Sequence, residues 1–360
     1  MKTLQVDVAV IGSGTAGMTA HKAARMQGKR VLMIESGPYG TTCARVGCMP
    51  SKLLIAAAEA AHAVAAAPAF GVHPGPVRID GQQVMARVRS ERDRFVGFVL
   101  DGVNAIPEEE KLRGHARFIS PGTLQVDEHT LVEAASVVIA TGSTPIVPPE
   151  WQAAGDRVIT SDAVFEWTDL PQSVAVVGGG VIGLELGQAL ARLGVRVTLF
   201  ARGNKVAQLT DPLVLREAGA VLARELDIRF QTTVAHVEKT PDGSGIVLTS
   251  RDGDGQEKTE QFEYLLAAIG RRPNVDQIGL DTAQIELDRH GIPLHDPHTM
   301  QCGKSAIFIA GDADNAMPLL PEAADEGRIA GENAARFPDV KPGSRTVAGR
   351  WRPGWRFAVP

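Results

Sequence analysis

Cys43 and Cys48 are the residues of this chain whose types and spacing most directly indicate chemistry. They lie in the run Gly40-Thr-Thr-Cys-Ala-Arg-Val-Gly-Cys-Met-Pro-Ser-Lys52, with four residues between them. Residues five apart on a regular α-helix have Cα atoms about 8 Å apart, whereas a disulfide requires about 4.4–6.8 Å. If the two bond, we expect Cys43 on a bend before a helix and Cys48 in the first turn of that helix.

The predicted surroundings of the pair favour reversible redox chemistry. Unsatisfied N–H groups and the helix dipole stabilise a thiolate at a helix start, and Lys52 adds positive charge one turn later. A purely structural disulfide is disfavoured, because the chain has three cysteines and its start favours a strand over a secretory signal. A zinc site would need four ligands, and no second Cys/His cluster supplies the missing ones, so we predict no metal site. We assign no chemistry to Cys302.

Two glycine-rich turns predict two dinucleotide sites. The first, Gly12-Ser-Gly-Thr-Ala-Gly17, follows an apolar strand and precedes a helix. Gly12 permits a tight turn, Gly14 lets the backbone approach a pyrophosphate, and Gly17 lets helix and strand pack closely. Glu35 ends the next predicted strand, where it can accept a hydrogen bond from an adenosine ribose.

The second turn, Gly178-Gly-Gly-Val-Ile-Gly183, has the same construction, with Gly178, Gly180 and Gly183 in the three glycine positions. Here Ala201 stands where the acid is expected, and Arg202 follows. An arginine there can pair with the 2′-phosphate of NADP, whereas the glycine pattern of this helix is usual for NAD. We therefore expect NAD slightly more than NADP.

Composition excludes several function classes. Hydrophobic content of 44%, charged content of 22% and a net charge of −5 over 360 residues are ordinary for a soluble globular protein. The absence of a basic stripe disfavours nucleic acid as a partner. The most apolar stretch, 53–70, is mostly alanine and contains Glu59 and His62, so we expect no membrane span and a cytoplasmic location.

Together these motifs resemble the pyridine nucleotide–disulfide oxidoreductases, most closely the dihydrolipoamide dehydrogenases. The resemblance covers about residues 5–340 and includes Val138-Ile-Ala-Thr-Gly142, Ala268-Ile-Gly-Arg-Arg-Pro-Asn274 and Ile307-Phe-Ile-Ala-Gly-Asp312. It implies bound FAD, a pyridine nucleotide, a small dithiol or disulfide substrate, lipoyl domains as a further candidate partner, and a homodimer. It adds these cofactor-binding residues: Lys52, Thr141, Gly142, Gly270, Gly311 and Asp312.

The resemblance also implies catalytic roles. Cys43 would exchange with substrate, Cys48 would face the flavin, and Lys52 would pair with Glu185 beside it. Departures from the family pattern are Thr41, where glycine is usual before the first cysteine, and Pro321, where histidine is frequent.

The resemblance implies an α/β fold of two Rossmann-like dinucleotide-binding domains, the second inserted into the first. We expect an FAD-binding domain over 1–147, an NAD(P)-binding domain over 148–270 and the returning part of the FAD domain over 271–340.

Residues 341–360 form an atypical tail, and we interpret 345–360 as truncated or out of frame; the alternative is a basic, aromatic tail that binds a partner. Relatives continue into a dimerisation domain with a catalytic His–Glu pair, whereas the last histidine here is His298. We therefore expect little lipoamide turnover, and a flavin-binding fragment is the alternative function.

Overall fold

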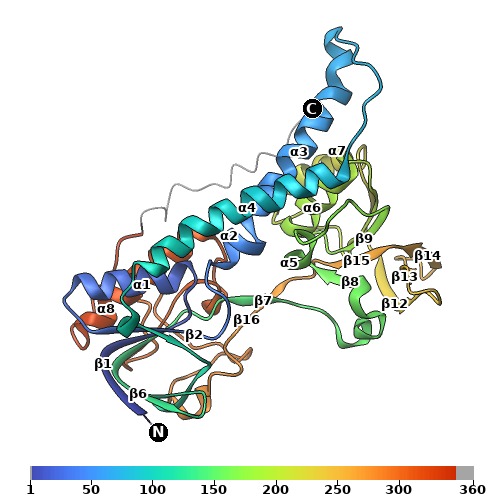
Figure 1. Ribbon diagram of the computed structural model, residues 1–360. Helices are drawn as coiled ribbons and strands as arrows, with labels where there is room; N and C mark the ends of the chain where they lie inside the picture. Colours follow the sequence, from blue (N-terminus) through green and yellow to red (C-terminus); the bar gives the residue numbers. More distant parts are fainter. Residues whose placement is uncertain (1, 346–360) are drawn as a thin grey trace. The chain divides into compact units, whose positions relative to one another are not determined.

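Two units make up residues 2–345, the part of the chain that the structure, a computed structural model, describes (Figure 1). The first unit contains the residues up to Thr42, Val96–Thr144 and the residues from Arg272; the second contains Cys43–Phe95 and Pro145–Arg271. The α/β fold class is confirmed. Residues 43–95 make most of their contacts within the second unit. The predicted atypical tail lies, after Arg345, outside the described residues.

A seven-stranded sheet forms the centre of the first unit, with the order β3-β2-β1-β6-β5-β4 and with β17 paired to β6. Its strands are β1 (Lys2–Ile11), β2 (Val31–Glu35), β3 (Lys111–Arg113), β4 (Ala116–Ser120), β5 (Thr123–Val126), β6 (Thr130–Ile139) and β17 (Ile307–Ile309). The β4–β5 and β5–β6 pairs are antiparallel, and the other pairs are parallel. The parallel register aligns Ile11, Ile34, Ile139 and Ile309. The residues that follow them therefore share one edge of the sheet, where ligands of α/β proteins bind.

Helices α1 (Thr15–Met26) and α8 (Leu320–Arg336) pack against each other and against one face of this sheet. Val8 and Val10 of β1 point into that layer, and Ala9 and Ile11 point to the opposite face. This alternation explains the continuous apolar run, because both faces are covered. A Cβ on Gly327 or Gly331 of α8 would lie 2.2 or 2.3 Å from a backbone oxygen of α1. Glycine at these two positions therefore lets the helices approach closely.

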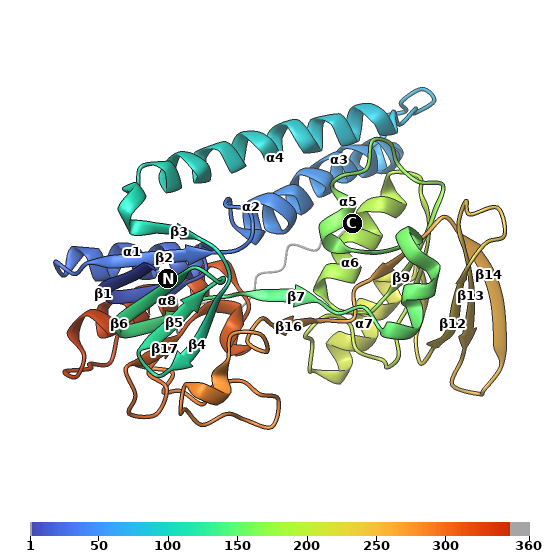
Figure 2. The same cartoon turned by 60° about the horizontal axis from the view of Figure 1, so that its bottom comes forward.

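The second unit contains a five-stranded parallel sheet with the order β11-β10-β9-β15-β8. Its strands are β8 (Val158–Thr160), β9 (Ser173–Val177), β10 (Arg196–Phe200), β11 (Asp227–Arg229) and β15 (Tyr264–Ala267). An antiparallel sheet of β12 (Thr233–Lys239), β13 (Ile246–Arg251) and β14 (Glu257–Phe262) lies beside it (Figure 2). Phe200 and Phe262 meet in the core that these two sheets share.

Five helices accompany the parallel sheet of the second unit, and all of them except the first contribute buried side chains to the core on its other face. They are α2 (Thr42–Val46), α3 (Cys48–Ala66), α5 (Ser161–Val164), α6 (Val181–Arg192) and α7 (Pro212–Leu222). Helix α4 (Gly81–Asn104) belongs to the second unit up to Phe95 and to the first unit from Val96. Short strands β7 (Ser143–Pro145) and β16 (Arg271–Pro273) pair where the chain passes between the units. The 3-10 helices are η1 (Ala67–Phe70), η2 (Glu108–Glu110), η3 (Pro149–Arg157), η4 (Leu280–Thr282) and η5 (Gly311–Asp314).

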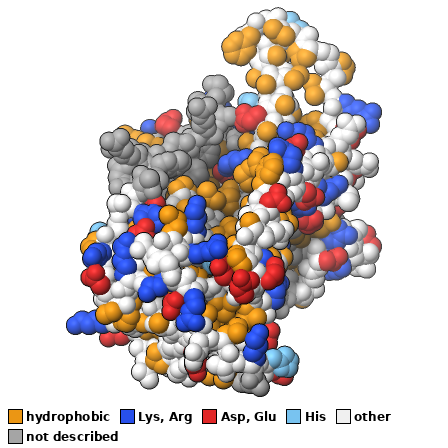
Figure 3. All heavy atoms as spheres, turned by 60° about the vertical axis from the view of Figure 1, so that its left-hand side comes forward, with side chains coloured by type: hydrophobic (Ala, Val, Ile, Leu, Met, Phe, Trp, Pro, Cys, Tyr) orange, Lys and Arg blue, Asp and Glu red, His pale blue; other side chains and the backbone are white. Residues whose placement is uncertain are grey.

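Helix α3 packs against α6 with one face and exposes the other. The run Thr42–Phe70 is long and apolar enough to cross a membrane, with a mean hydropathy of 1.6 in its most apolar window. Leu54 on it is nevertheless buried in the core of the second unit, and Glu59 is ion-paired with Arg192 of α6 at 2.6 Å. The helix therefore contacts the second unit along one side, and only 11% of its most apolar window is buried. The chain at and after its outer end exposes Phe70, Val72 and Val77, and Figure 3 shows hydrophobic side chains gathered on the part of the surface that projects from the molecule.

Candidate functional site

The two cysteines lie on consecutive helical segments with a break at Gly47 between them. Cys43 is in the single-turn helix α2, and Cys48 is the first residue of α3. The expectation for Cys48 agrees with this placement, whereas Cys43 lies on a helical turn and not on an open bend. Thr41, just before α2, has φ of +56°. A β-branched residue is strained in this left-handed region, which explains why glycine suits the position.

Cys43 and Cys48 are present as free thiols whose side chains share a hydrogen bond. This bond, together with the backbone at the start of α3 and the charge of Lys52, lowers the pKa of Cys48 to about 7. The same hydrogen bond and burial raise the pKa of Cys43 well above its ordinary value. The pair therefore contains one sulfur that ionises near neutral pH and one that keeps its proton. Cys302 differs, because burial raises its pKa to about 12.

Lys52 and Glu185 form an ion pair next to Cys48. Lys52 Nζ lies 2.6 Å from Glu185 Oε1, although the two residues are on different helices, α3 and α6. Glu185 is the less exposed partner, at 21% of its side-chain surface. The structure thus brings together the two residues that the resemblance paired. The positive charge of Lys52 remains close enough to favour the Cys48 thiolate.

The first glycine turn has the shape that a dinucleotide requires. Gly12 has φ of +109°, and a Cβ on it would lie 2.2 Å from the carbonyl oxygen of Ala140. A Cβ on Gly17 would lie 2.0 Å from the Gly12 oxygen, which explains the close packing of α1. A Cβ on Gly14 would meet nothing within 4 Å. The backbone at Gly14, at the N-terminus of α1, is therefore open to a phosphate group.

Glu35 ends β2 and is held against this turn. Its Oε2 accepts hydrogen bonds from the backbone N–H and the hydroxyl of Ser13 at 2.8 and 2.7 Å, and its Oε1 accepts from Gly37 N–H at 2.7 Å. The carboxylate is thereby fixed beside the residue that separates Gly12 and Gly14. This is the placement expected for an acceptor of ribose hydroxyls.

Two further predicted residues, Thr141 and Asp312, lie at the same edge of the first unit. Asp312 Oδ2 accepts a hydrogen bond from the Ser143 hydroxyl at 2.7 Å. The Thr141 carbonyl accepts one from Asn274 Nδ2 at 3.1 Å, while the Thr141 hydroxyl is buried without a partner in the described residues. Such an orphaned hydroxyl points to a group that satisfies it. These polar groups, with the open Gly14 turn, fit a dinucleotide such as FAD.

The other glycines of the predicted set shape the chain around these groups. Gly142 has φ of +69°, and its carbonyl accepts a hydrogen bond from Asn274 N–H at 2.9 Å. Gly311 has φ of +69° and lies directly against Ala16 of α1. Gly270, with φ of +128°, follows β15 in the second unit and accepts a hydrogen bond from Ile146 N–H.

The second glycine turn repeats the geometry of the first. Gly178 has φ of +123°, and a Cβ on it would lie 2.2 Å from the Ala268 oxygen; one on Gly183 would lie 2.1 Å from the Gly178 oxygen. A Cβ on Gly180 would again meet nothing within 4 Å. Arg202 is exposed directly after Ala201. The second unit therefore also fits a dinucleotide.

Sequence reasoning missed Ser13, Ser143 and Asn274, which hold predicted site residues in place. Ser13 lies inside the first glycine turn, so its role could have been suspected from the motif. Ser143 and Asp312 are 169 positions apart, and Asn274 and Thr141 are 133 apart. Only the folded chain shows these two contacts.

Comparison with known proteins agrees with this geometry. The family described as "Pyridine nucleotide-disulphide oxidoreductase" matches residues 6–327. The chain belongs to this family. It is 33% identical to dihydrolipoyl dehydrogenase of Thermus scotoductus over 343 residues, which are 93% of this chain and 71% of that protein. It is 31% identical to dihydrolipoyl dehydrogenase of Bacillus subtilis over 350 residues, which are 92% of this chain and 72% of that protein.

A solved structure supports the fold of this family member. The Cu(II) complex of the HOCl-induced flavoprotein disulfide reductase RclA from Escherichia coli aligns with a TM-score of 0.79 and 21% identity. The alignment covers 95% of this chain and 73% of RclA. The predicted enzyme class, an oxidoreductase similar to dihydrolipoyl dehydrogenase, is thus confirmed at the level of the family.

Proposed function

We propose that the chain is an FAD-dependent dithiol–disulfide oxidoreductase that passes electrons between a small dithiol, the Cys43–Cys48 pair, FAD and a pyridine nucleotide. The observation that carries the proposal is the hydrogen bond between the thiols of Cys43 and Cys48, which raises the pKa of the first and lowers the pKa of the second. The relatives are named dihydrolipoyl dehydrogenase, which favours a dihydrolipoyl compound such as dihydrolipoamide as the dithiol. A chain with only three cysteines fits a reducing compartment, so we also propose a cytoplasmic location.

The acidity difference assigns a role to each cysteine. In the oxidised pair, a substrate thiolate attacks Cys43 Sγ, the Cys43–Cys48 bond breaks, and Cys48 leaves as a thiolate. The second substrate thiol, after losing its proton, attacks the substrate sulfur of the mixed disulfide and releases Cys43, which takes up a proton. A leaving thiol of low pKa departs faster. Cys48, with a pKa of about 7, is therefore the better leaving sulfur.

Lys52 and Glu185 support this step through charge. Lys52 stabilises the Cys48 thiolate, and Glu185 holds the ammonium group in place at 2.6 Å. An ion pair in a partly enclosed site keeps both charges satisfied. We propose that these two residues position charge beside the reacting sulfur.

The cofactor sites follow from the two glycine turns. We propose that the Gly14 backbone, Glu35, Thr141 and Asp312 hold FAD and that the Gly180 turn holds NAD or NADP. FAD, when bound, supplies a two-electron carrier between the cysteine pair and the pyridine nucleotide. The chain's own residues bind and orient these groups.

Single-turnover reduction of the holo chain tests the proposal. Excess dihydrolipoamide should bleach the visible absorbance of the bound flavin in the wild type and in Cys302→Ser, whose buried thiol is the matched control. Cys43→Ser and Cys48→Ser should each lose this reaction but keep bound flavin. Mild oxidation of the wild type should yield a Cys43–Cys48 disulfide in peptide mass spectra.

Two results would contradict the proposal. One is purified protein that binds no flavin even when FAD is supplied. The other is flavin reduction by dihydrolipoamide at the wild-type rate in Cys43→Ser or Cys48→Ser.

A further inference from the structure

The two glycine turns can be compared residue by residue, because they have the same backbone register. Gly12 N–H donates to the Ile34 carbonyl at 2.8 Å, and Gly178 N–H donates to the Phe200 carbonyl at 2.9 Å. The residue after each acceptor is Glu35 in the first unit and Ala201 in the second. Ala201 therefore occupies the position of the ribose-binding acid.

The substitution changes the chemistry of the second turn. Glu35 accepts hydrogen bonds from Ser13, whereas Ala201 is buried and presents only a methyl group to the corresponding residue, Gly179. A carboxylate at this position accepts from the 2′-hydroxyl of NAD and repels a 2′-phosphate. The second turn has neither the acceptor nor the repulsion.

Two cations follow Ala201 in a loop that folds back onto this turn. The loop returns through a hydrogen bond from Ala207 N–H to the Gly179 carbonyl at 2.9 Å, with Ala207 at φ of +51°. A Cβ on Gly179 would lie 3.0 Å from the carbonyl oxygen of Lys205. The backbone of Lys205 is thus fixed beside the glycine turn. Arg202 and Lys205 are both exposed.

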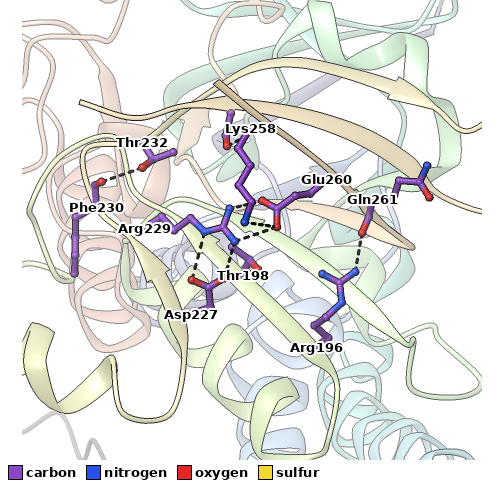
Figure 4. A network of polar contacts seen from close by, with 10 residues as sticks. Arg196, Thr198, Asp227, Arg229, Phe230, Thr232, Lys258, Glu260 and Gln261 are labelled. Atoms are coloured by element: carbon purple, nitrogen blue, oxygen red, sulfur yellow. Dashed lines mark hydrogen bonds and ion pairs between the residues drawn. The ribbon is translucent and has the colours of Figure 1, made fainter. Parts of the chain in front are cut away.

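Neither cation is neutralised by a neighbour in the described part of the chain. Among residues 2–345, no ion pair or side-chain hydrogen bond involves Arg202 or Lys205. The arginines of the adjacent strands differ (Figure 4), because Arg229 is held by Asp227 and Glu260, and Arg196 donates to the Gln261 carbonyl at 2.7 Å. The arginines of β10 and β11 are thus engaged by neighbouring groups, whereas Arg202 and Lys205 of the loop after β10 are available to an anion.

We propose that the second site selects a 2′-phosphorylated dinucleotide, NADP(H), and that Arg202 and Lys205 bind its 2′-phosphate. This reverses the slight expectation of NAD from the glycine pattern. The inference rests on the proposed function, since it concerns the pyridine-nucleotide site. Charge-assisted bonds from two cations to one phosphate give the selectivity.

Calorimetric titration of the holo chain, with its flavin site filled, tests the inference without turnover. The probes are 2′,5′-ADP and 5′-AMP, which differ only in the 2′-phosphate. We expect 2′,5′-ADP to bind at least about tenfold more tightly. Arg202→Ala and Lys205→Ala should each weaken 2′,5′-ADP binding about tenfold, with little effect on 5′-AMP. Arg216→Ala is the control, because Arg216 lies on α7 and pairs with its neighbour Glu217 at 3.1 Å.

A gain-of-acid variant provides a second measurement that does not depend on losing a cation. Ala201→Glu restores the missing acid and should reduce the preference for 2′,5′-ADP over 5′-AMP. Equal affinity of the wild type for the two probes, with the variants unchanged, would overturn the NADP inference while leaving a pyridine-nucleotide site intact. Binding of neither probe, nor of NADPH or NADH, would overturn the proposed function itself.

Discussion

Replacing Glu326 with glutamine should make the protein more stable at pH 8 and leave its stability near pH 4.5 almost unchanged. Glu326 lies on α8 and is fully buried. Its Oε2 accepts a hydrogen bond from Gly311 N–H at 2.9 Å, and its Oε1 lies 3.1 Å from Arg345 Nη1. Burial, followed by the charges of Asp314 and Glu322, raises the pKa of Glu326 to about 7.

The magnitude follows from the two pKa values. Between an ordinary value of 4.5 and about 7, the folded chain holds a proton on Glu326 that the unfolded chain has released. Stability from this group is therefore complete below pH 4.5 and is lost as the pH rises to 7. At about 1.4 kcal/mol per pH unit, the total loss is about 3 kcal/mol.

Glutamine keeps the shape of the side chain and an acceptor for Gly311, but it never ionises. Urea unfolding, followed by far-UV circular dichroism, should give a free energy of unfolding for Glu326→Gln that rises relative to wild type between pH 5 and 8. The expected difference at pH 8 is up to about 3 kcal/mol in favour of the variant.

Glu332→Gln is the matched control on the same helix. Glu332 is partly exposed and forms ion pairs with Arg328 and Arg336 at 3.3 and 3.7 Å. Its loss should cost less than about 1 kcal/mol. Parallel pH–stability curves for wild type and Glu326→Gln would refute the reasoning, because they would mean that Glu326 binds protons equally in both states.

Three other substitutions test separate parts of the structure. Lys52→Met removes the cation beside Cys48 and should raise that thiol's pKa from about 7 toward 9.0, slowing iodoacetamide alkylation at pH 7 about threefold or more; an unchanged alkylation profile would contradict this. Thr41→Gly relieves the left-handed strain and should increase the free energy of unfolding in urea by about 1 kcal/mol, whereas a decrease would disprove the strain. Arg192→Met leaves the Glu225 carboxylate without its partner at 2.6 Å and should cost about 3 kcal/mol or more in the same assay; recovery in a double variant with Glu225→Gln is the check.

The fold class was predictable because it follows from short sequence patterns. Each glycine turn lies between an apolar strand and a helix, so three glycines and two hydrophobic runs determine a βαβ unit. The same signals placed Gly14 and Gly180 at open positions, which the structure shows. Glu35 was predicted for the same reason, since a strand end is a local feature.

Contacts between distant segments were not predictable in the same way. Helix α3 packs on α6 in the second unit, and nothing in the spacing of these two segments along the chain indicates that contact. The partnership of Ser143 and Asp312 depends on two strand ends that only the folded sheet brings together. The pairing of Lys52 with Glu185 was expected from family resemblance, because nothing in the spacing of these residues indicates it.

The packing of α8 on α1 has a consequence for the order in which the protein matures on the ribosome. The inner face of α1 is covered by a helix that emerges roughly 300 residues later, about 15 to 60 s at ordinary elongation rates. The second unit's Pro145–Arg271 stretch is contiguous and can close in the meantime. The alanine face of α1, the first helix to be made, therefore stays uncovered during most of synthesis. It is a binding site for a chaperone that acts on nascent chains.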